Sequence, residues 1–262
     1  ASGSTFAGWS GACTGTGTCT IAAGSSAVDV TASFDTSGGT GPLADPVDFV
    51  HFTINSTGKV EKAVANPELL NLSEFPVKVV INTTSIRDSH KDVHIPGLWT
   101  KSLKEKKSPY LLQEHQMKFD KVISDRVTAY VKTMTWRELG FEYEGTTEAL
   151  IFDAMVEKDR NPYMAEQYAK ARVNNHSVGM QYVKIELAMN SDTKFDQEEK
   201  AVWDKYIGLI ANREEVEEDG YFYAVTEAKY IEGSAVVAGS NFATPTLSMG
   251  KDIAPPEAVA DT

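Results

Sequence analysis

Residues 173–187 read VNNHSVGMQYVKIEL, and the interpretation of the whole chain depends on this stretch. It has the character of a β-strand whose polar start places a histidine beside a serine. Because neighbouring side chains of a strand point to opposite faces, His176 is badly placed to act as a base for Ser177. Two interpretations remain. Ser177 is a small residue that fits a sheet, or it is a nucleophile whose partners come from elsewhere in the chain.

Length and composition predict a folded, acidic protein. The chain has 262 residues, of which 42% are hydrophobic, and this is enough for one large domain or two small ones. Its 37 acidic and 25 basic residues give a net charge of -12, which argues against a nucleic-acid partner. No run of about eighteen apolar residues occurs and no charged-then-apolar leader opens the sequence, so we expect neither a membrane span nor a signal peptide.

The N-terminal segment, residues 1–45, differs in composition from the remainder. It is rich in Gly, Ser, Thr and Ala, contains no Lys or Arg, and runs into the linker-like TSGGTGPLADP. Its cysteines, Cys13 and Cys19, could close a short disulfide loop in an oxidising compartment, and no further cysteine completes a zinc or CxxC site. We therefore predict this arm, a core domain over 46–248 and a disordered tail over 249–262.

Within this arm, FAGWSGACTGTGTCTIAAGSSAVDVTASF resembles the closing half of small cysteine-containing β-repeats of bacterial surface proteins. Half a repeat buries its own face poorly, so the resemblance implies a fused or borrowed segment with no part in the chemistry. A flexible or edge-strand arm is the plainer interpretation. A cell-surface β-protein that carries the core domain as a passenger is a further alternative, and it requires an export signal.

From about residue 46 the pattern is mixed α and β. Period-two alternation and short apolar runs predict strands, whereas helical spacing and capping residues such as Asn161 before Pro162 predict helices. The predicted strands are 47–54, 75–83, 110–118, 127–136, 173–187 and 221–239, and the predicted helices are 100–107, 146–159, 161–173 and 194–219.

A serine nucleophile needs a base within hydrogen-bond reach and a third group that orients the base. Among the five histidines, His115 is the best candidate, because alternation along its predicted strand puts it at a strand end on one face with Leu111, Gln113 and Met117. A lone histidine on such a face is ordinarily structural. The pattern alone therefore leaves the role of His115 open.

Four segments follow one another in an order that is known from a protein family. They are IRDSHKDVHIPGLWTKSL (86–103), YLLQEH (110–115), NNHSVGMQY (174–182) and VTEAKYIEGSAVVAGSNFATP (225–245). Together they resemble the landmarks of the prohead (procapsid) maturation serine proteases of tailed bacteriophages. In that family an Asp-containing loop leads to Pro-Gly and a helix, one strand supplies the catalytic histidine, a Ser-x-Gly strand supplies the nucleophile, and a Glu-x-Ser-leaning strand and a closing turn follow.

Matched to these landmarks, Ser177 is the expected nucleophile and His115 the expected general base. Glu232 matches the glutamate strand best and is the preferred third member of the triad. Glu227 is the alternative, although strand alternation places it on the opposite face. Gly179 shares the face of Ser177 and leaves room for a peptide carbonyl. Backbone N–H groups near the site are expected to form the oxyanion hole.

The resemblance implies a mixed α/β (α+β) domain with a mostly antiparallel, barrel-like β-sheet flanked by helices, as in the herpesvirus assemblins. It also implies a serine endopeptidase that acts inside the procapsid, in the host cytoplasm, on the phage scaffold, the major capsid protein and itself. Self-association as a homodimer or larger assembly is expected by analogy. The alternative from another class is a non-catalytic capsid or scaffold interaction protein that retains the fold.

A metal site is an open alternative for Asp88, His90, Asp92 and His94. Their period-two spacing would put all four side chains on one face of a strand, and histidine with carboxylate suits Zn²⁺ or Mn²⁺. The family resemblance instead implies that this stretch is a loop, and Pro96 and Gly97 turn the chain directly after it. On that basis we expect no metal and no cofactor.

Overall fold

The computed structural model describes the side chains of residues 65–105 and 108–250, and it describes only the backbone of four short strands before them. The chain divides into two compact units, Ala1–Lys62 and Ala63–Thr262. The predicted boundary after residue 45, both cysteines, residues 251–262 and most of the predicted strand 47–54 lie outside the described residues. In the first unit two antiparallel pairs form: β1 (Thr5–Gly11) with β2 (Val30–Asp35), and β3 (Thr53–Ile54) with β4 (Val60–Glu61).

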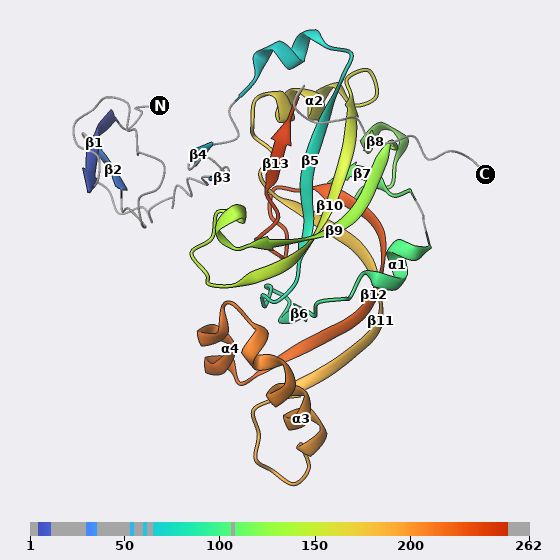
Figure 1. Cartoon of the computed structure of the whole chain (residues 1–262). Helices are drawn as coiled ribbons and strands as arrows, with labels where there is room; N and C mark the ends of the chain where they lie inside the picture. The colour runs from blue at the N-terminus through green and yellow to red at the C-terminus, as the bar shows by residue number, and fades with distance from the viewer. Residues whose placement is uncertain are drawn as a thin grey trace, which may run out of the picture. The chain divides into compact units, whose positions relative to one another are not determined.

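One sheet of the second unit is antiparallel throughout, and its strand order is β13-β5-β10-β9 (Figure 1). The predicted strands 75–83 and 127–136 are present as β5 and β9. The bounds are β5 (Glu74–Thr83), β9 (Val127–Thr135), β10 (Thr146–Glu157) and β13 (Thr246–Met249).

The other large sheet is mixed, with the order β11-β12-β7-β8, and a further strand, β6, pairs with β12. β12 runs antiparallel to β11 but parallel to β6 and β7. These strands are β6 (Asp92–His94), β7 (Tyr110–Gln113), β8 (Val122–Ser124), β11 (His176–Met189) and β12 (Tyr221–Ala235). Among the described residues the two large sheets do not close into a barrel, so the mixed α/β class is right and the barrel-like sheet is not found.

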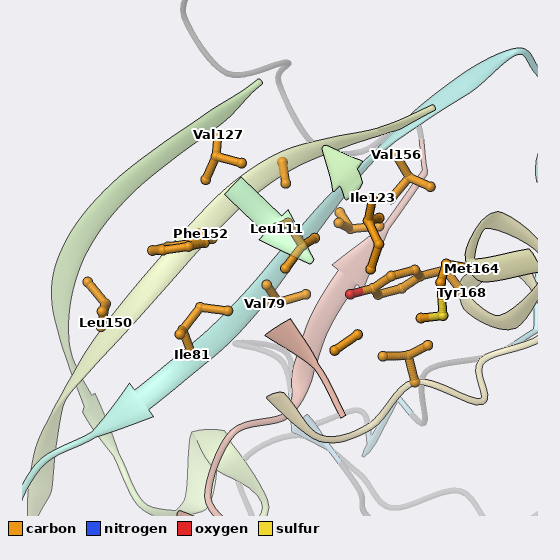
Figure 2. Close-up of a cluster of buried hydrophobic side chains, with 14 of the residues drawn as sticks. Val79, Ile81, Leu111, Ile123, Val127, Leu150, Phe152, Val156, Met164 and Tyr168 are labelled. Atoms are coloured by element: carbon orange, nitrogen blue, oxygen red, sulfur yellow. The ribbon is translucent and has the colours of Figure 1, made fainter. Parts of the chain in front are cut away.

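The main hydrophobic core lies between the two large sheets (Figure 2). Phe152 and Ile81 come from one sheet, and Leu111 comes from the other. Gly233 of β12 permits their close approach, because an added Cβ would lie 2.7 Å from Phe152 Cε2 and 2.8 Å from Ile81 Cδ1. The core therefore covers one face of β12, and alternating residues of this strand are directed to the opposite face.

The predicted helix 146–159 is wrong, because these residues form strand β10. The strand lies between β5 and β9, and the run ALIFDAMV (149–156) is apolar on both of its faces. A strand that is buried on both faces shows a continuous apolar run, which periodicity does not separate from a buried helix. Thr146 and Thr147 at its start are of a type that caps helices, but β-branched residues also favour strands.

Short helices lie around the sheets. One predicted helix start is confirmed, and one predicted long helix is interrupted. Asn161 caps α2 as predicted, since its Oδ1 accepts a hydrogen bond from the Met164 N–H at 3.1 Å. The predicted single helix 194–219 is interrupted where Ile210 is extended and buried. The helices are η1 (Pro67–Asn71), α1 (Thr100–Lys104), η2 (Phe119–Lys121), η3 (Arg137–Leu139), α2 (Pro162–Ala169), α3 (Gln197–Tyr206), η4 (Ile207–Leu209) and α4 (Arg213–Asp219).

The antiparallel β11–β12 pair extends beyond the rest of the mixed sheet, and α3 and α4 lie near its far end (Figure 1). α3 packs against β11, and its Trp203 contacts Phe222 of β12. No helix among the described residues is long and apolar enough to cross a membrane.

Candidate active site

His115 and Glu232 form a close pair on the side of the mixed sheet opposite the main core. His115 Nδ1 lies 2.6 Å from Glu232 Oε1. The carboxylate accepts this hydrogen bond, so Nδ1 carries the proton and Nε2 keeps its lone pair. The His115 side chain is 42% exposed, whereas that of Glu232 is only 4% exposed. A buried carboxylate that orients a solvent-accessible imidazole is the base-and-orienter arrangement of serine hydrolases.

The backbone at His115 differs from the predicted strand. β7 ends at Gln113, and Glu114 and His115 both adopt the left-handed conformation, with φ of 51° and 55°. The alternation argument that placed His115 on one face with Leu111 is therefore wrong. Each left-handed non-glycine residue costs on the order of 1–3 kcal/mol and is maintained by its surroundings. Here the Glu114 N–H donates to Ala235 O at 3.0 Å.

Ser234 connects the two members of the pair. Its hydroxyl donates to Glu232 Oε2 at 2.7 Å and accepts from the His115 backbone N–H at 3.1 Å. Its side chain is fully buried, so the hydroxyl is inaccessible to a substrate. One serine thereby fixes both the carboxylate and the strained turn. Sequence reasoning did not assign Ser234 a role, although its position two residues after Glu232 put it on the same face.

Gly179 makes room for the Glu232 side chain. It is the register partner of Glu232 across the β11–β12 ladder. A Cβ added to Gly179 would lie 2.1 Å from Glu232 Oε1 and 2.8 Å from its Cδ, so the carboxylate lies directly over this glycine. His115 is hydrogen-bonded to that same oxygen. The predicted room for a peptide carbonyl over Gly179 is therefore wrong, because the Glu232 carboxylate fills it.

Ser177 lies two residues before Gly179 on the same face of β11, about 7 Å along the strand. It is the register partner of Ser234 and is partly accessible to solvent. Among the described residues there is no hydrogen bond between the Ser177 hydroxyl and His115. The structure thus brings all three predicted triad residues onto one face of three adjacent chain segments, with one of the two triad hydrogen bonds formed.

His176 is buried on the opposite face and is structural. Its Nδ1 donates to Thr244 O at 2.9 Å, and its Nε2 accepts from the Tyr168 hydroxyl at 3.0 Å. Burial lowers the pKa of His176 to about 4, so the ring is neutral at neutral pH. The strand argument that excluded His176 as the base for Ser177 agrees with this placement.

Glu227, the alternative third member of the triad, pairs with a lysine and not with His115. Its carboxylate forms an ion pair with Lys101 Nζ at 2.5 Å, on the surface near α1. Of the two glutamates considered from the sequence, only Glu232 contacts His115.

The hydrogen bond to Glu232 raises the pKa of His115, and partial burial opposes this effect. A higher pKa makes the neutral ring a stronger base, at the cost of a larger protonated fraction at neutral pH. The carboxylate therefore both orients the imidazole and stabilises its cation.

The closing turn, 239–245, holds the start of β11 in place. The Thr244 hydroxyl donates to His176 O at 2.6 Å and accepts from the His176 N–H at 3.1 Å. Asn241 fixes the turn itself, since its Nδ2 donates to Thr83 O at 2.8 Å. Gly239 lies beside the proposed nucleophile, because an added Cβ would be 3.5 Å from Ser177 Cβ and 2.9 Å from His176 O.

A surface hollow of about 640 Å³ does not include the proposed triad. Arg126 within it is bound by Glu74 and Glu157, so its charge is already neutralised. We assign no substrate to it. Its lining residues are Ser73, Glu74, Arg126, Glu157, Lys158, Asp159 and Pro162.

Comparison with models of protein families, with curated proteins and with solved structures found no match to this chain.

Proposed function

We propose that the chain is a serine endopeptidase with Ser177 as nucleophile, His115 as general base and Glu232 as the residue that orients the base. The observation that carries the proposal is the 2.6 Å contact between His115 Nδ1 and Glu232 Oε1, made directly over Gly179 on the strand of Ser177. A merely structural histidine needs neither a buried carboxylate nor a strained backbone.

In the proposed reaction, His115 Nε2 takes the proton of the Ser177 hydroxyl as Oγ attacks the peptide carbonyl carbon. The imidazolium is stabilised by Glu232, and it then gives the proton to the leaving amine. The resulting acyl-enzyme is hydrolysed by water, which His115 activates in the same way. Ser177 and His115 form their hydrogen bond when substrate is bound, since such contacts are often long in the free enzyme.

Ser177 is a better nucleophile candidate than Ser234. Ser177 is partly exposed, whereas the Ser234 hydroxyl is fully buried and its proton is already donated to Glu232. The proposal therefore gives the two serines different tasks, attack for Ser177 and positioning for Ser234.

The biological setting that we propose is the maturation of a bacteriophage procapsid. The support is the order of the four sequence segments and the position of Ser177, His115 and Glu232 within them. The substrates would be the phage scaffold, the major capsid protein and the protease itself, cut within the procapsid after the shell has assembled. The enzyme would act as a homodimer or a larger assembly.

A non-catalytic capsid or scaffold interaction protein is the second candidate. The observation that favours it is the missing hydrogen bond between Ser177 and His115 among the described residues. This candidate requires that the His115–Glu232 pair only stabilise the turn after β7.

The proposal is tested by incubating the purified chain with a proteome-derived peptide library and identifying new termini by mass spectrometry. The comparison includes Ser177→Ala and, as a matched control, Ser248→Ala, which alters a half-buried strand serine of the other sheet. We expect new termini with the wild type and the control and none with Ser177→Ala. Cleavage that survives Ser177→Ala would contradict the assignment of the nucleophile.

The procapsid setting needs a separate experiment, in which the chain is co-expressed with a phage scaffold and major capsid protein. We expect fragments of both proteins with the wild type and none with Ser177→Ala. The fragments should appear after shells form. Intact capsid proteins, together with cleavage of library peptides, would reject the setting and leave the endopeptidase proposal standing.

A further inference from the structure

Asp88, Asp92 and His94 form a second cluster on the mixed sheet, apart from the proposed triad. One oxygen of each carboxylate and a ring nitrogen of His94 lie within 4.8 Å of one another. All three residues are buried, with exposed fractions of 5%, 5% and 2%. Of the four residues that the sequence pattern grouped together, His90 alone is exposed and outside the cluster.

The local backbone fixes both carboxylates. Asp88 Oδ1 accepts hydrogen bonds from the N–H groups of His90 and Asp92, at 2.9 Å and 3.0 Å, and so closes a tight turn. Asp92 Oδ2 accepts a hydrogen bond from the Tyr182 hydroxyl. Among the described residues, no hydrogen bond engages Asp88 Oδ2 or Asp92 Oδ1. In each aspartate, hydrogen bonds to one carboxylate oxygen fix the side chain, and the other oxygen is available to bind a cation.

The negative charge of the cluster is not neutralised by side chains. Arg87 and Lys91 flank it in sequence, but both form ion pairs with Asp219 of α4. Within the described part of the chain, neither Asp88 nor Asp92 forms an ion pair with a basic side chain. Two buried carboxylates without a counter-charge are unfavourable, and buried charges in proteins are ordinarily paired or bound to a metal.

His94 adds an independent observation. Its Nδ1 lies 2.7 Å from Asn82 Nδ2, and Asn82 Oδ1 accepts from the Trp99 indole N–H at 3.3 Å. Its other ring nitrogen, Nε2, is completely buried and has no hydrogen-bond partner. Unpartnered buried nitrogens are rare in folded proteins, and Nε2 is the usual metal-binding atom of histidine.

We propose that Asp88, Asp92 and His94 Nε2 bind a divalent transition-metal ion of the Zn²⁺ class. Two carboxylates and one imidazole suit Zn²⁺ or Mn²⁺, whereas Mg²⁺ and Ca²⁺ prefer oxygen ligands throughout. Three protein ligands leave a fourth position for water. On binding, the ring proton of His94 resides on Nδ1, and the Asn82 amide turns to present its oxygen to that proton, which gives up the hydrogen bond from the Trp99 indole N–H.

The ion would lie apart from the proposed triad. His94 pairs with Val225 on β12, seven residues before Glu232, so the two sites lie roughly 20 Å apart along the strand. The ion would join β6 to β11, because Asp92 also binds Tyr182. This proposal does not depend on the proposed peptidase activity, and the Ser177→Ala variant is expected to bind the ion unchanged.

The test uses the full chain after treatment with a chelator, titrated with Zn²⁺ alone in a calorimeter. Asp88→Asn is the main variant, since an asparagine oxygen keeps both backbone hydrogen bonds and removes the charge. His90→Ala is the matched control from the same turn. Cys13→Ser and Cys19→Ser are present in every sample, which removes the two thiols as competing ligands.

We expect one Zn²⁺ per chain for the wild type and for His90→Ala, and binding weaker by roughly 100-fold or more for Asp88→Asn. Asn82→Asp is expected to bind roughly 10-fold more tightly, because a carboxylate accepts both the His94 and the Trp99 protons. Circular dichroism establishes that each variant is folded. The absence of saturable binding by the wild type, or equal binding by Asp88→Asn, would overturn the proposal.

Discussion

His115 and His176 are both candidate bases for Ser177 in the sequence, yet the fold places them in opposite environments. His176 adjoins Ser177 in the chain, but it points into the core, where Thr244 and Tyr168 occupy both ring nitrogens. His115 is 62 residues away in sequence, and β12 brings it to the face of Ser177 through Glu232 and Ser234. Pairing across the sheet, not adjacency in the chain, places a histidine on the face of Ser177.

The electrostatics of the two rings differ for the same reason. A carboxylate raises the pKa of His115, whereas burial among uncharged groups lowers the pKa of His176 to about 4. In the proposed reaction the first ring carries a positive charge, whereas the second ring is kept neutral.

The largest expected effect is the loss of activity in His115→Ala. Removing the base of a serine protease lowers kcat by roughly 10⁶-fold. Because the ring is partly exposed, we expect the free energy of unfolding to change by about 1 kcal/mol or less. The measurement is peptide hydrolysis together with urea unfolding.

His176→Ala tests the comparison between the two histidines at the buried ring. It leaves a cavity and unpaired polar groups in the core, so we expect a loss of about 2–4 kcal/mol in unfolding free energy. Activity per folded molecule should fall far less than in His115→Ala. A loss of activity equal to that of His115→Ala in folded protein would mean that the two histidines are not distinguished as proposed.

Glu232→Gln comes next, with an expected loss of roughly 10⁴-fold in kcat. The glutamine no longer stabilises the imidazolium, so the pKa of His115 falls. The acidic limb of the pH profile of kcat/KM should therefore move to lower pH. A rate profile measured with the residual activity tests this, and Glu227→Gln is the control that should leave the profile unchanged.

Gly179→Ala is expected to reduce activity by roughly 100-fold, because the added methyl group displaces the Glu232 carboxylate and with it the His115 ring. Gly208→Ala is the matched control, since nothing lies within 4 Å of its added Cβ. Normal activity of folded Gly179→Ala would be inconsistent with a base that is oriented by the carboxylate over Gly179.

The smallest effect is the pH dependence of stability. Since its pKa in the folded state is raised above 6.5, His115 contributes stability that is fully present below pH 6.5 and is lost as pH rises through the folded pKa. His176 acts in the opposite direction, because its stabilising contribution is lost as pH falls from 6.5 towards about 4. The stability difference between the wild type and His115→Gln should shrink as pH rises above 6.5, measured by urea unfolding; a growing difference would contradict the pairing.

Local sequence patterns predicted the parts of the fold that depend on neighbouring residues. The strands β5, β9, β11 and β12 and the capped helix α2 follow from alternation, apolar runs and the Asn161–Pro162 signal. β10 was missed because a strand buried on both faces has no alternation.

The placement of His115 could not be derived from such patterns. It depends on the parallel pairing of β7 with β12 and on two consecutive left-handed residues, neither of which has a local sequence signal here. The family resemblance selected the residue, and the strand argument offered for it was wrong. The buried cluster around His94 was visible in sequence as a period-two motif, but only the fold separates His90 from it.

The most direct measurement is the reaction of the chain with a fluorophosphonate, a reagent that phosphonylates activated serine hydroxyls. Peptide mass mapping locates the adduct, and His115→Ala serves as the inactive control. We expect one adduct per chain on Ser177 in the wild type and none in His115→Ala. An adduct elsewhere, equal labelling of both proteins, or no labelling of the folded wild type would contradict a nucleophile at Ser177 activated by His115.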